Sequence, residues 1–136
     1  MMKTKEKGDI AEMAVATDLL KRGFKVAKPL GESWEYDLIL YRNNNFERIE
    51  VKYTESNGDV LTVRARSHSI LAGRITKTKI YTSDDIDWLV VYDKTTDKCY
   101  YIPSSTLTGA EQFTLRLSEP KKKYTRIRYA KDFMTI

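Results

Sequence analysis

The spacing of hydrophobic residues changes along the chain and predicts one long helix followed by several strands. Over residues 4–22 the apolar positions recur three and four residues apart, and Gly23 follows, which predicts a helix that ends at the glycine. Segments rich in branched and aromatic residues then predict strands. These segments are residues 24–27, 36–41, 46–53, 60–63, 87–92 and 99–102, with weaker candidates at 113–117 and 125–129. The apolar face of the helix is expected to contain Ile10, Met13, Ala14, Thr17 and Leu20.

The segments between the predicted strands define the order of the fold. Turn-forming residues occur at 43–45, 57–59 and 95–98. Residues 68–79 show no clear period and are expected to form a basic loop or a short irregular helix. Residues 87–92 are almost continuously apolar, which predicts a strand buried on both faces. A helix followed by a meander of strands and a hairpin predicts an α/β or α+β sheet, with the helix on one face and a single domain over residues 1–136.

Composition limits the chemistry that this chain can perform. Hydrophobic residues make up 41% and charged residues 32% of 136 residues, as in a folded globular domain. The longest uncharged apolar run, residues 88–92, is far shorter than the roughly 20 residues of a membrane span. No membrane association and no secretory signal are therefore expected, and the predicted location is a reducing cytoplasm. One cysteine, Cys99, and one histidine, His68, exclude an internal disulfide, a cysteine zinc cage and a histidine-rich site, which leaves carboxylates and lysines.

Positive charge is concentrated in two stretches that contain no acidic residue. Residues 62–82 and residues 121–131 both carry only basic charges, within a net charge of +5. Such stretches favour a surface that follows a phosphate backbone, although they are also compatible with ordinary solvated faces. The candidate DNA-binding residues of the first stretch are Arg64, Arg66, Arg74, Lys77 and Lys79.

A pair of carboxylates and a lysine form the strongest candidate site. Asp37 lies in one predicted strand, and Glu50, Val51 and Lys52 lie in the strand that returns beside it. Side chains alternate along a strand, so Glu50 and Lys52 share a face, where Asp37 can meet Glu50. Two carboxylates and the Val51 carbonyl form an oxygen site suited to Mg²⁺, and the lysine can stabilise charge that develops on a phosphate. The alternative is an exposed strand with alternating charges. Glu12, close to the apolar face of the helix, is expected either to face water or to point towards this pair.

The order of these residues resembles the PD-(D/E)xK nuclease superfamily. The resemblance covers about residues 7–105, and it depends on segments 7–12, 20–26, 36–39 and 48–52. Segments 63–67, 86–92 and 96–103 look like the branch of cyanobacterial group I intron homing endonucleases. Two departures are that Glu35 and Tyr36 stand where the name of the family has proline, and that Glu50 stands where the homing branch has glutamine.

This resemblance implies a fold, an activity and roles for the candidate residues. The implied fold is an α/β, restriction-endonuclease-like core, with the N-terminal helix packed on a mixed central β-sheet and a C-terminal hairpin. The implied activity is Mg²⁺-dependent hydrolysis of DNA, with Mn²⁺ able to substitute. Asp37, Glu50 and the Val51 carbonyl would bind the metal, Lys52 would activate or orient water, and Glu12 would assist. The DNA-binding residues would be Arg64, Arg66, Arg74, Lys77 and Lys79.

The resemblance also leads to expectations about the DNA substrate and the number of subunits. A homing-type endonuclease reads a duplex sequence, whereas a Holliday-junction resolvase, the nearest competitor, reads the shape of branched DNA. A third possibility is an inactive DNA-binding module with the same fold. Because one site per subunit cuts one strand, duplex cleavage or junction resolution calls for at least a homodimer. The resemblance to homing endonucleases implies a dimer of dimers.

Overall fold

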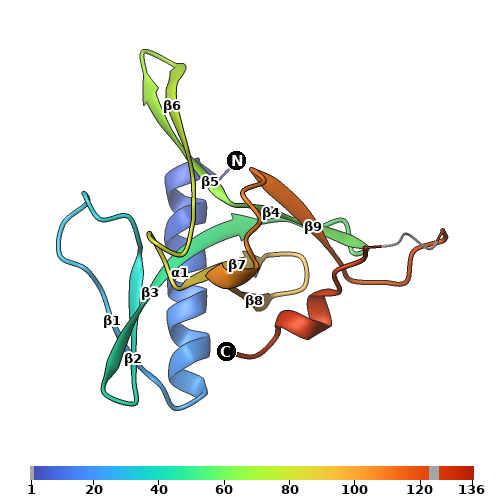
Figure 1. Ribbon diagram of the computed structural model, residues 1–136, viewed down its shortest axis with the longest axis horizontal. Coiled ribbons are helices and arrows are strands. Elements are labelled where there is room, and N and C mark those ends of the chain that lie inside the picture. The colour runs from blue at the N-terminus through green and yellow to red at the C-terminus, as the bar shows by residue number, and fades with distance from the viewer. Residues whose placement is uncertain (1, 123–125) are drawn as a thin grey trace.

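A mixed β-sheet with a helix across one face forms the centre of the protein in the computed structural model, which describes residues 2–122 and 126–136 (Figure 1). Among these residues, five strands make the central sheet in the order β1-β2-β3-β7-β8. Neighbouring strands are antiparallel except for β3 and β7, which run parallel. The mixed sheet and the late β7–β8 hairpin confirm the expected fold. The strands are β1 (Lys25–Ala27), β2 (Leu38–Arg42), β3 (Asn45–Thr54), β7 (Trp88–Asp93) and β8 (Lys98–Pro103).

Helix α1 (Thr4–Lys21) buries a different face from the one predicted. Ala11, Val15 and Leu19 are buried against the sheet, whereas Met13 and Leu20 are exposed. The predicted face was wrong because the helical period fits two neighbouring stripes; of the predicted residues, only Ala14 packs against the core, where it is partly buried. Contact with the sheet, and not side-chain size, selects the buried stripe, since Leu19 is buried and Leu20 is exposed. The helices of the described residues are too short or too polar to cross a membrane.

The face of the sheet opposite α1 is covered by β4 (Val60–Arg64), β9 (Gln112–Arg116) and the short 3-10 helix η2 (Ala130–Phe133). Another 3-10 helix, η1 (Ser104–Thr106), follows β8. Along β7, Val90 packs on the side of α1 and Leu89 packs on the side of β4 and β9. The prediction that this strand is buried on both faces is therefore confirmed. The weak candidate strand at 113–117 corresponds to β9. In the other weak candidate, residues 126–128 are not a strand, Tyr129 makes an isolated bridge to Arg116, and Thr125 lies outside the described residues.

Residues 68–79, expected as a loop or irregular helix, belong instead to a hairpin of β5 (Arg66–Leu71) and β6 (Arg74–Ile80). The hairpin projects away from the sheet, at the top of the view in Figure 1. Ala72 and Gly73 form its turn with φ values of 52° and 77°, the left-handed conformation that a two-residue hairpin loop requires. The prediction was wrong for two reasons: both faces of most of the hairpin are exposed, so no apolar alternation arises, and alanine is an unusual residue for this turn.

Candidate active site

Asp37 is fixed at the point where β2 begins beside β3. Its backbone amide donates to the Ile49 carbonyl at 2.8 Å, and its Oδ2 accepts from the Val51 amide, also at 2.8 Å. The strand therefore starts two residues later than predicted, and Asp37 lies directly before its first residue. The amide and carbonyl of one residue in an extended strand point to the same side, so the Val51 carbonyl faces the side on which Asp37 lies.

Glu50 is buried next to this carboxylate. The exposed fraction of Glu50 is only 8%, because the residue lies in the middle of β3, between β2 and β7. Burial raises the pKa of Glu50 well above its usual range, and the negative charge of Asp37 raises it further. Lys52 acts in the opposite direction, with its Nζ 3.7 Å from Glu50 Oε1. The site therefore concentrates negative charge where solvent can do little to stabilise it.

Lys52 and Glu50 share one face of β3, as the alternation of the strand predicts. Lys52 Nζ also lies 5.3 Å from the centre of the Tyr81 ring. Tyr81 is buried, and burial and the nearby charge of Glu50 raise the pKa of its hydroxyl. Its backbone amide donates to the Ala65 carbonyl at 3.0 Å, which holds the end of the hairpin at the site. Tyr81 could not be recognised from the sequence, because its contact with Glu50 joins segments 31 positions apart and follows no short motif.

Glu12 lies on the side of α1 that faces the site. It lines a cavity of about 290 Å³ together with Asp37 and Lys28. Its Oε1 pairs with Lys28 Nζ at 2.9 Å, and this hydrogen bond raises the pKa of the lysine. The helix thus brings a third acid near the pair, and Lys28 is a second cation that the sequence analysis did not find.

The hairpin forms one wall of a second cavity, of about 360 Å³, that reaches Asp37, Glu50 and Tyr81. The hairpin residues that line it are Ser67, Ser69, Lys77 and Lys79. Two of the five predicted DNA-binding residues thus border the carboxylates directly.

The predicted DNA-binding residues differ in how freely they present their charge. Lys79 pairs with Glu35 and, at 2.9 Å, with Asp85 Oδ1. Arg66 Nη1 lies 3.1 Å from Glu111 Oε2. The remaining three are exposed: Arg64, Arg74 and Lys77. Arg64 on β4 and Arg66 on β5 line a further cavity together with Lys52, so these two strands also border the candidate site.

The donor atoms suit a hard cation. Among residues 2–122 and 126–136, no group of three or more histidine, cysteine, aspartate or glutamate side chains is placed to hold a metal. Asp37 and Glu50 nevertheless lie together, with the Val51 carbonyl on the side of Asp37, and Mg²⁺ needs only one or two carboxylates because it keeps several waters. A nearby cation would also stabilise the ionised form of Glu50, which burial penalises. These residues therefore fit Mg²⁺.

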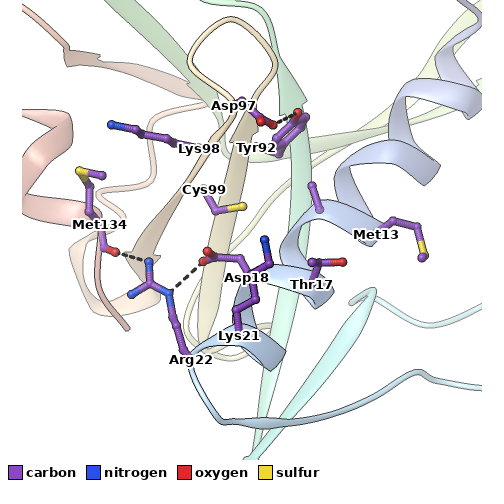
Figure 2. Close-up of a pocket in the computed structure, with 11 residues that line it drawn as sticks. Met13, Thr17, Asp18, Lys21, Arg22, Tyr92, Asp97, Lys98, Cys99 and Met134 are labelled. Carbon is purple, nitrogen blue, oxygen red and sulfur yellow. Dashed lines mark hydrogen bonds and ion pairs between the residues drawn. The ribbon is translucent and has the colours of Figure 1, made fainter.

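A cavity of about 420 Å³ at the far end of α1 has a different character (Figure 2). Arg22 there pairs with Asp18 at 3.0 Å and donates to the Met134 carbonyl at 2.7 Å, which ties the C-terminal segment to the helix. Tyr101 also donates to Asp18. Burial raises the pKa of the Cys99 thiol to about 12, so it stays protonated and unreactive. These contacts hold the C-terminal segment against the helix.

The fold is similar to that of a solved nuclease. A bacterial homing endonuclease, I-Ssp6803I, superposes with a TM-score of 0.76 at 27% identity, over 97% of this chain and 88% of that chain. A Holliday junction resolvase from Archaeoglobus fulgidus, Hjc, gives a TM-score of 0.47 at 15% identity, over 81% and 84% of the two chains. No curated protein sequence matches significantly. The family model described as PD-(D/E)XK endonuclease matches residues 2–136, nearly the whole sequence, and the chain therefore belongs to the PD-(D/E)XK endonuclease family.

Proposed function

We propose that this chain is a Mg²⁺-dependent DNA endonuclease of the homing type, with one endonuclease domain spanning residues 1–136. The observation that carries the proposal is that Asp37 and Glu50 meet in a cavity walled by a basic hairpin, with Lys52 Nζ 3.7 Å from Glu50 Oε1. Membership of an endonuclease family supports the hydrolytic activity. The similarity to a bacterial homing endonuclease over 97% of the chain supports recognition of a duplex sequence.

Different residues of the chain have different roles in hydrolysis. Asp37, Glu50 and the Val51 carbonyl would hold Mg²⁺, with Mn²⁺ as a substitute. The metal supplies Lewis-acid polarisation of the phosphate and lowers the pKa of a bound water. Lys52, held between Glu50 and the Tyr81 ring, places an ammonium beside the reacting phosphate and stabilises its developing charge.

Glu12 and Lys28 line a cavity that Asp37 also lines. Their ion pair fixes the Glu12 carboxylate in the cavity that Asp37 lines. In that position the carboxylate accepts a hydrogen bond from water and orients it, so we assign it a positioning role.

DNA binding falls to the basic residues around the site: Arg64, Arg66, Arg74, Lys77 and Lys79. The arginines are the better candidates for base edges, because a guanidinium can donate two parallel hydrogen bonds to guanine. One active site cuts one strand, so cleavage of both strands requires a homodimer or a dimer of dimers.

The test is cleavage of two labelled substrates, a random-sequence duplex library and a synthetic four-way junction. Each is incubated with Mg²⁺, Mn²⁺ or EDTA and with wild type, Lys52→Ala or Lys98→Ala. Lys98 is an exposed lysine on β8 and serves as the matched control. We expect metal-dependent cleavage of the duplex that Lys52→Ala reduces by about 10²–10³-fold and Lys98→Ala leaves unchanged.

The other outcomes separate the alternatives. Cleavage of the junction alone would replace the homing role with a resolvase. Tight DNA binding that is indifferent to Mg²⁺ and to Lys52→Ala, without cleavage of either substrate, would replace the enzyme with a binding module.

A further inference from the structure

The β5–β6 hairpin ends in exposed aliphatic side chains, which we call the aliphatic tip: Ile70, Leu71 and Ile75. Their exposed fractions are 68%, 71% and 60%. Ile70 lies directly opposite Ile75 across the hairpin, and Leu71 lies opposite Arg74. A cluster of aliphatic groups at the end of a projecting element is unfavourable in water and indicates a contact surface.

The hairpin is braced in a way that keeps this tip extended. His68 Nδ1 and Thr78 Oγ1 lie 2.9 Å apart across the strands, and Thr76 Oγ1 donates to the Ser69 carbonyl at 3.1 Å. Thr76 is the extra residue of a β-bulge on β6, since Ser69 pairs with Lys77 and Ile70 with Ile75, and this hydrogen bond ties it to β5. A preformed hairpin loses little conformational freedom when it binds, so less of the binding free energy is lost to ordering its side chains.

The charge around the tip selects the kind of partner. No acidic residue occurs between Asp59 and Asp84, and Arg74 and Lys77 are exposed on the hairpin itself. An aliphatic surface framed only by positive charge fits a polyanion with an apolar interior, and duplex DNA has this character.

The tip also lies on an extension of the active-site cavity. Ser67 and Ser69 line that cavity, and Leu71 follows on the same face of β5 because side chains alternate along a strand. Leu71 is four residues beyond Ser67, about 13 Å at ~3.3 Å per residue. Stacked base pairs are about 3.4 Å apart, so the tip reaches roughly four base steps from the site.

We propose that Leu71 inserts as a wedge between neighbouring base pairs of the DNA bound at the active site, and kinks it there. Arg74 and Lys77 lie opposite Leu71 and Ser69 across the hairpin, on the same face, and hold the flanking phosphates. Burial of the aliphatic side chains offsets the cost of opening the base step, as in proteins that bend DNA with apolar wedges. This inference rests on the proposed function, because it takes DNA as the substrate, but it specifies how the DNA is deformed.

The test uses an alternating TA duplex with 2-aminopurine in place of adenines on one strand. TA steps open most easily, and the repeat presents the same step in every binding register. Ca²⁺ replaces Mg²⁺ so that binding is measured apart from cleavage. Wild type is compared with Leu71→Ser and with the control Leu20→Ser, the same change at a leucine on α1 that is 59% exposed.

We expect 2-aminopurine fluorescence to rise when wild type or Leu20→Ser binds, because the base loses its stacking partner. Leu71→Ser should bind about tenfold more weakly and give no rise. Wild-type binding without a rise, or a rise that Leu71→Ser retains, would refute the wedge and leave the endonuclease proposal intact. A change in subunit number in Leu71→Ser, measured by light scattering, would instead make the tip a contact between copies. Failure of wild type both to bind this duplex and to cleave either substrate above would overturn the proposed function as well.

Discussion

Replacing Glu50 with glutamine keeps the size of the side chain and removes the charge that its environment penalises. Glu50 is buried, and burial and the charge of Asp37 raise its pKa in the folded protein. In the unfolded chain the same carboxyl titrates near its ordinary value of 4.5. Above that value the unfolded state releases its proton while the folded state retains it. The free energy of unfolding of the metal-free protein must therefore fall as the pH rises towards the folded-state pKa, and the glutamine variant lacks this loss.

The size of the effect follows from the linkage. One group that is protonated only in the folded state changes the free energy of unfolding by about 1.4 kcal/mol per pH unit. Between pH 5.5 and 7.5 this gives a maximum of about 3 kcal/mol, and relaxation around the charge reduces it, so we expect about 2 kcal/mol. Between pH 5.5 and 7.5 in EDTA, the free energy of unfolding of Glu50→Gln should accordingly rise by about 2 kcal/mol relative to that of wild type.

Urea unfolding followed by the fluorescence of Trp34 and Trp88 measures this difference at each pH. Comparison with the variant cancels the contribution of the other titrating groups. Saturating Mg²⁺ adds a second arm, because an ion at 100 times its Kd stabilises the folded state by about 2.7 kcal/mol. Wild type should gain this stability at pH 7.5, and Glu50→Gln should gain much less. Parallel stability curves for the two proteins from pH 5.5 to 7.5 would refute the assignment of a raised pKa to Glu50.

Three further changes test individual parts of the molecule. Tyr81→Phe removes the hydroxyl near Glu50 but keeps the ring beneath Lys52, so single-turnover cleavage should fall about tenfold while DNA affinity is unchanged. Glu12→Gln breaks an ion pair that is partly exposed; it should slow cleavage about tenfold and change the free energy of urea unfolding by under ~1 kcal/mol. Asp93→Ala removes a fully buried carboxylate that accepts hydrogen bonds from the Ser56 amide and hydroxyl at 2.8 and 2.7 Å, and urea unfolding at pH 7 should show a loss of about 3 kcal/mol.

Most of the candidate site was predictable from the sequence because it is built from local geometry. Alternation along β3 puts Glu50 and Lys52 on one face whatever the rest of the chain does. The asparagine turn at residues 43–45 brings β2 back along β3, and pairing of Leu38 with Ile49 places Asp37 beside Glu50. The shared face of Glu50 and Lys52 and the position of Asp37 beside Glu50 each depend on a few residues close together in the chain, so both can be predicted from the sequence.

The remaining features depended on packing between distant segments. Two stripes of α1 have a helical period, and only contact with the sheet selects Ala11, Val15 and Leu19 over Met13 and Leu20. The β5–β6 hairpin buries little on either face, so its residues carry no alternating signal that a sequence pattern can show.

Long-range contacts also completed the site. Tyr81 reaches Glu50 from the end of the hairpin, and Lys28 reaches Glu12 from the segment after β1. From the sequence, Lys79 is one of several basic residues expected to bind DNA, but in the folded chain it forms ion pairs with Glu35 and Asp85. The sequence by itself determined which groups share a strand, since backbone geometry fixes that spacing. The tertiary structure decided which face is buried and which charges meet, because those outcomes depend on the packing of segments far apart in the chain.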